Sequence, residues 1–151
     1  MTAPATIRES EKRRSALRWG LGVAAVLFGA ATLVSGGKVL FGGAAARADA
    51  GAVVDFVLLF NFGAGFAYIL TGLGVAMHLR WSLHVARFLA GANLAVFAAF
   101  GVHIALGGAF EMRTVAAMTL RSGFWVGQAL ALAHVFRAAS GQLFTSRPAR
   151  S

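Results

Sequence analysis

The stretch VVDFVLLFNFGAGFAYILTGLGVAM, residues 53–77, decides the fold together with LHVARFLAGANLAVFAAFGVHIAL, residues 83–106. A short basic segment, HLRW at residues 78–81, lies between the two apolar runs. Each run is longer than the roughly 20 residues that a helix needs to cross about 30 Å of hydrocarbon. Two adjacent runs of this length predict a transmembrane helical hairpin.

The composition agrees with a membrane location. The chain has 151 residues, of which 58% are hydrophobic and 13% are charged, whereas a soluble domain carries about 25% charged residues. It has no cysteine, which excludes disulfides, thiolate metal sites, iron–sulfur clusters and cysteine-based redox chemistry. We therefore expect an integral membrane protein with one membrane domain.

The hydropathy pattern predicts an all-α, polytopic fold in which four transmembrane helices form an antiparallel bundle. The spans are expected at about residues 17–36, 52–77, 82–106 and 123–139. Residues 107–122 are too polar to span, and we expect them to form a short, structured interfacial segment before the last helix, with a short helix as one option for it. Residues 1–16 are interpreted as a cytoplasmic flank, because the apolar run that follows is too long for a signal peptide. Residues 140–151 are expected to form a cytoplasmic tail.

The basic residues predict the orientation. With the N-terminus inside, most of the 14 Lys and Arg residues lie on the inner side. The outer side then carries Lys38, Arg47, Arg113 and Arg121. This distribution predicts that both termini lie in the cytoplasm. The expected location is a bacterial inner membrane. The net charge of +9 is interpreted as attraction to anionic lipid headgroups rather than to nucleic acid. Expected partners are the lipid bilayer, other membrane subunits or a second copy.

Small residues recur on single helix faces. One face of the first span carries Gly22, Gly29 and Gly36. One face of the second carries Asn61, Gly65, Tyr68 and Gly72. In the third span a four-residue repeat predicts a seam against another helix, formed by Gly91, Ala95 and Ala99. The amide of Asn61 would need a partner in hydrocarbon, and Asn93 or Gln128 is the expected one.

Four polar residues are expected to meet at the outer end, namely Asp55, His103, Glu111 and Arg113. Unpaired charge at that depth is costly, so we predict that these groups pair with each other. The cluster is interpreted as structural, and a metal or proton site is its alternative. The sequence contains no nucleophile–base pair, phosphate-binding loop or nucleotide fingerprint, so no catalytic residue and no bound metal are predicted.

Two histidines suggest a haem alternative. His84 and His134 differ in expected depth by roughly 5 Å, at about 1.5 Å of rise per residue. A b-type haem could use two such ligands on facing helices. The favoured expectation is that no cofactor is bound and that both histidines lie at the interface or bond to a neighbouring helix.

Several residues resemble those of the DoxX-like family of small bacterial membrane proteins. They are RWGLG at residues 18–22, Gly29, Lys38, Gly65 and GLG at residues 72–74. The resemblance covers about the first half of the chain. It implies a four-helix membrane protein linked to membrane oxidoreductase systems as a partner subunit, and it supplies no catalytic residues.

The favoured function is non-catalytic: an accessory or assembly subunit, or a small-ligand binder, of a membrane complex such as a respiratory or redox complex. The alternative is a haem- or quinone-associated electron-transfer component. A dimeric small-solute transporter comes third, because Asp55 is the only acid within a predicted span and lies near the span's end.

Overall fold

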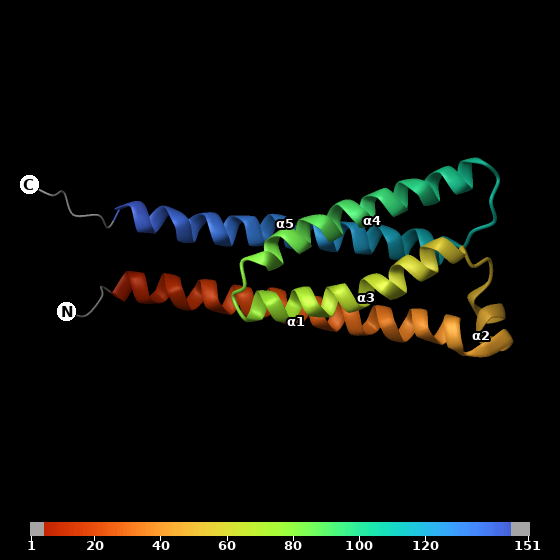
Figure 1. The fold of residues 1–151 in the computed structure, drawn as a ribbon, viewed down its shortest axis with the longest axis horizontal. Helices are drawn as coiled ribbons and strands as arrows, with labels where there is room; N and C mark the ends of the chain where they lie inside the picture. The colour runs from red at the N-terminus through yellow and green to blue at the C-terminus, as the bar shows by residue number, and fades with distance from the viewer. Residues whose placement is uncertain (1–4, 146–151) are drawn as a thin grey trace, which may run out of the picture.

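A computed structural model describes residues 5–145, and within them all regular secondary structure is helical. The elements are α1 Ala5–Phe41, α2 Gly43–Ala50, α3 Asp55–Ala76, α4 Trp81–Ala105 and α5 Met112–Thr145. The four long helices run antiparallel in chain order (Figure 1). The short α2 lies at the end opposite the start of α1, together with the α4–α5 connection, and we call this the α2 end. Arg147 and Arg150 of the predicted tail lie outside the described residues.

Three helices of the described chain are long and apolar enough to cross a membrane: Glu11–Phe41, Asp55–Ala76 and Trp81–Ala105. Their outward faces carry large apolar side chains, such as Val34, which is 75% exposed, and Phe88, which is 73% exposed. Acyl chains suit such a surface, whereas water does not. Helix α5 contains the polar residues Gln128 and His134 and is not among the three. The fourth crossing therefore stays a prediction.

Glycines bring the backbones of α1 and α3 into direct contact. A methyl group added at Gly22 would lie 2.8 Å from the carbonyl oxygen of Gly72, and one added at Gly29 would lie 2.8 Å from the carbonyl oxygen of Gly65. Close backbone approach of this kind is how small residues stabilise helix pairs in lipid. The two glycine faces predicted from the sequence thus meet each other, and α1–α3 is the most extensive helix pair.

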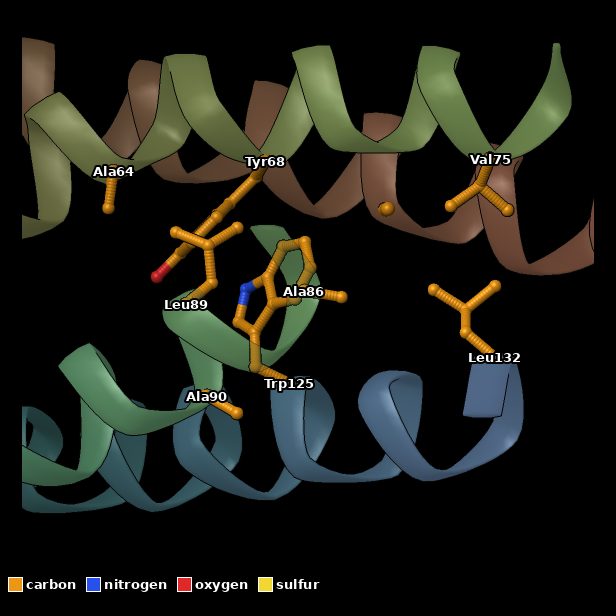
Figure 2. Close-up of a cluster of buried hydrophobic side chains, with 9 residues drawn as sticks. Ala64, Tyr68, Val75, Ala86, Leu89, Ala90, Trp125 and Leu132 are labelled. Atoms are coloured by element: carbon orange, nitrogen blue, oxygen red, sulfur yellow. The ribbon is translucent and has the colours of Figure 1, made fainter. Parts of the chain in front are cut away.

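The centre of the bundle is filled by a cluster of buried side chains (Figure 2). Tyr68 of α3 and Trp125 of α5 are both fully buried, with ring centroids 4.7 Å apart. Leu89 of α4 and Leu132 of α5 belong to the same cluster. A second buried cluster includes Phe100 and packs at the α2 end. These clusters hold the α1–α3 pair against the α4–α5 pair.

The predicted seam on α4 is wrong. Gly91, Ala95 and Ala99 are all exposed, and nothing lies within 4 Å of a methyl group added at Gly91. The buried face of α4 instead carries Ser82, Ala86, Leu89, Ala90, Asn93 and Phe100. Small residues occur on both faces of this helix, so their spacing alone does not show which face packs inside. The face that packs inside is the one that carries Asn93, because the amide of Asn93 forms hydrogen bonds in the core.

The predicted interfacial segment is also corrected. Residues 112–122 are the first turns of α5, and only residues 107–111 of the predicted segment are non-helical. The backbone N–H groups of Thr114 and Val115 donate to the carbonyl oxygen of Glu111, which starts the helix there. Inward-facing residues then recur every three or four positions without interruption, at Val115, Met118, Ser122, Trp125, Gln128 and Leu132. A continuous buried stripe explains why the helix does not break at Gly123.

Candidate functional site

The polar residues at the α2 end attach the two connections to each other. The carboxylate Oε1 of Glu111 accepts a hydrogen bond from the backbone N–H of Ala52 at 3.1 Å. The guanidinium of Arg113 donates to the backbone carbonyl oxygen of Asp49 at 2.7 Å. Both contacts join the chain at the start of α5 to the segment that comprises the last turn of α2 and the connection after it. They satisfy backbone groups that the ends of helices leave without partners.

Asp55 and His103 have other partners. Asp55 forms an ion pair with Arg47, and both side chains are exposed. The Nε2 atom of His103 lies 3.1 Å from the carbonyl oxygen of Ala109, and its ring stacks on Phe100. Asp55 and His103 therefore contact different segments at the α2 end.

The predicted cluster of Asp55, His103, Glu111 and Arg113 is thus wrong in its pairing. All four lie at the α2 end, but no hydrogen bond or ion pair of the described residues joins any two of them. Asp55 pairs with Arg47 instead. The other three side chains bond to backbone groups at the α2 end. Within residues 5–145, no three His, Asp or Glu side chains gather where they could hold a metal ion.

His84 and His134 do not form an enclosed pair. Both side chains are exposed, His84 on α4 and His134 on α5. A haem between helices would need both imidazoles directed into a shared interior space. Because both side chains are exposed, they do not enclose such a space.

The buried polar side chains make a set of contacts that differs from the expected one. The hydroxyl of Tyr68 donates to Asn93 Oδ1 at 2.8 Å, and Asn93 Nδ2 donates to the carbonyl oxygen of Leu89 at 2.8 Å. Gln128 Nε2 donates to the carbonyl oxygen of Leu21 at 2.9 Å. Asn93 and Gln128 are therefore engaged elsewhere, and the predicted bond from either of them to Asn61 is wrong.

Asn61 is left with weak partners. Its Nδ2 lies 3.5 Å from the sulfur of Met118, and its Oδ1 is buried without a hydrogen-bond partner among the described residues. The same is true of the Nε atom of Arg121. Four other buried side-chain atoms of the described residues also lack a partner, and they belong to Arg18, Ser122, Trp125 and Gln128. Buried polar atoms in proteins almost always have partners, so the unpaired atoms of Asn61 and Arg121 call for an explanation.

Both residues line the same cavity. It has a volume of about 300 Å³ and lies between α1, α3 and α5 toward the α2 end. Its polar lining comes from Ser35, Asn61, Arg113, Thr114 and Arg121, and the rest of its lining consists of small and aliphatic residues. Ligand pockets in proteins have volumes of roughly 300–1,000 Å³ and combine an apolar lining with a few convergent polar groups.

A second cavity of about 270 Å³ adjoins the first. The two share Ser35, Ala117 and Arg121, and the second continues along α1 to Phe28. Both lie where α1 faces α5, the least extensive of the helix pairs in contact. Arg121 thus stands at the junction of two hollows.

From the sequence, Arg121 is expected only as one of the outer-side cations. The signal for its role is the spacing of Arg113, Ala117 and Arg121, each four residues from the next. This spacing places both arginines and the small residue between them on one face of a helix. That signal requires α5 to begin at Met112, which the polarity of residues 107–122 obscures.

Comparisons with models of known protein families, with curated proteins and with solved structures found no match. The resemblance to DoxX-like proteins therefore stays a prediction.

Proposed function

We propose that this chain is a non-catalytic integral membrane protein that binds a small amphiphilic ligand in the cavity between α1, α3 and α5. The proposal includes four membrane crossings in a bacterial inner membrane, with both termini in the cytoplasm and the α2 end outside. The observation that carries it is the cavity of about 300 Å³ whose lining includes Asn61 and Arg121, each of which has one buried polar atom without a partner among the described residues.

The free-energy cost of the unpaired buried groups favours the binding of a ligand. A buried polar group without a hydrogen bond is costly, and the cost is larger for a charged group than for an amide. A ligand that supplies partners to Asn61 and Arg121 recovers part of that cost, and its binding stabilises the folded state. Such a ligand must also be compatible with the apolar residues around it, such as Val57 and Leu58.

We further propose that the protein works as an accessory or assembly subunit of a membrane complex. The resemblance to DoxX-like proteins supports this part of the proposal. Co-purification of a second membrane protein in mild detergent from the native membrane tests it, and a chain that purifies alone at every detergent strength contradicts it.

The two alternative functions have less support. Haem-linked electron transfer needs an enclosed histidine pair, and His84 and His134 are exposed. Solute transport by titration of a buried acid needs such a group, but Asp55 is exposed at the end of α3. A quinone is the ligand of one of these alternatives, and it is therefore included among the probes below.

Ligand binding is tested with a substitution whose larger side chain fills the cavity. Ala117 lines both hollows, whereas its neighbour Ala116 is exposed. Ala117→Phe should therefore remove binding, and Ala116→Phe, with the same added volume, should retain it. Binding is measured by native mass spectrometry in a neutral detergent with three probes: palmitate, hexadecanol and decylubiquinone. The proposal is contradicted if no probe binds the wild-type protein, or if Ala117→Phe binds all probes as the wild type does.

A further inference from the structure

We infer that the occupant is an anionic single-chain amphiphile, whose carboxylate or phosphate head is bound by Arg121 and whose chain follows the hollow between α1 and α5. This inference rests on the proposed function and adds the chemical class of the ligand.

Arg121 carries a positive charge and lines both cavities. It lies nine residues after the start of α5, about 14 Å along the helix at 1.5 Å per residue. The chain has only five acidic residues. Asp55 pairs with Arg47, Glu111 accepts from Ala52, and no carboxylate of the described residues forms an ion pair with Arg121. A partly buried cation without an ion-pair partner among the described residues is a candidate functional site.

The charged side chains that line the first cavity are all positive. Two arginines, Arg113 and Arg121, line it together with Thr114 and Asn61, and no Asp or Glu does. Arginine binds carboxylates and phosphates through two parallel hydrogen bonds, which a neutral head group cannot form as strongly. The amide of Asn61 can add a donor by rotation, because its present contact is only the sulfur of Met118.

The second cavity extends from Arg121 along α1 toward the middle of the bundle. It reaches Phe28, and the rest of its lining comes from Ala31, Thr32, Ser35, Ala117 and Leu120. Most of these residues are apolar, and Phe28 lies seven residues before Ser35, about 10 Å along α1. A head at Arg121 and a chain directed toward Phe28 place the polar part nearer the α2 end and the apolar part nearer the middle of the bundle. A lipid in the same half of a bilayer has this orientation.

The experiment compares palmitate with hexadecanol, which has the same chain and a neutral head. The wild-type protein in neutral detergent should bind palmitate at least about tenfold more tightly than hexadecanol. Arg121→Gln should remove this difference. Arg137→Gln is the matched control, because Arg137 is an exposed arginine of the same helix toward its other end, and it should preserve the difference. Lysophosphatidate and inorganic phosphate are added as further probes.

The outcomes separate this inference from the proposed function. Preference for palmitate or for lysophosphatidate over hexadecanol supports the inference and identifies the head group. Equal binding of palmitate, hexadecanol and decylubiquinone, all blocked by Ala117→Phe, overturns the anionic head but leaves a ligand cavity. Binding of inorganic phosphate as tight as that of lysophosphatidate overturns the role of the chain. The wild-type comparison needs no variant, so a fold defect in Arg121→Gln does not prevent the test.

Discussion

Replacing glycines of α3 by alanine should give a graded loss of stability, because the space beside each glycine differs. A methyl group at Gly72 would lie 2.7 Å from the carbonyl oxygen of Gly22 and 2.9 Å from the backbone nitrogen of Val26. Backbone atoms of a packed helix cannot move individually, so α1 and α3 must separate. Overpacking of this kind costs about 1–3 kcal/mol of unfolding free energy.

The other glycines of the same helix set the scale. At Gly65 the methyl group would meet the side chain of Leu33 at 2.8 Å and the carbonyl oxygen of Gly29 only at 3.4 Å. A side chain can shift, so Gly65→Ala should cost less, about 1 kcal/mol. At Gly63 nothing lies within 4 Å. Gly63→Ala should be neutral or stabilising by up to about 1 kcal/mol, because alanine is the better helix former.

The assay is reversible unfolding in mixed micelles, with increasing sodium dodecyl sulfate and helicity as the readout. The expected order of stability is Gly63→Ala, then Gly65→Ala, then Gly72→Ala. A second Ala substitution at Gly22 in the Gly72→Ala protein should cost less than it does in the wild type, because the helices have already separated there. Equal stability of the Gly63→Ala and Gly72→Ala proteins would refute direct backbone contact between α1 and α3.

Three other changes test the polar contacts and the topology. Tyr68→Phe should lower the unfolding free energy by about 1–3 kcal/mol, because it leaves the buried Oδ1 of Asn93 without its donor; the same micelle titration measures it, and an unchanged midpoint would contradict the bond. Asp55→Asn should change stability by less than about 1 kcal/mol, because its ion pair is exposed, and a larger loss would show that Asp55 has a further partner. The chain lacks cysteine, so single cysteines at Ala45 and Leu79 report the topology directly. An impermeant maleimide added to intact cells should label position 45 and not position 79, and the reverse pattern would invert the proposed orientation.

Hydropathy located the helices of the central hairpin well. The apolar runs at residues 53–77 and 83–106 correspond to α3, Asp55–Ala76, and α4, Trp81–Ala105. Helix formation in such runs is a local property, because every backbone group finds its partner within the same segment. The glycine spacing also predicted the contact face of α1, since a stripe of glycines is the one place where backbones can approach closely.

The tertiary structure decided which of several similar groups meet. In a helix that is apolar on all sides, hydropathy does not distinguish the inner face from the outer, so the seam through Ala95 was as plausible as the buried face through Asn93. Asp55 had several cations within reach in principle, and only the placement of α2 selects Arg47. Arg121 became a candidate binding residue only when α5 placed it beside a hollow with no ion-pair partner among the described residues, because burial and contacts depend on all the helices at once.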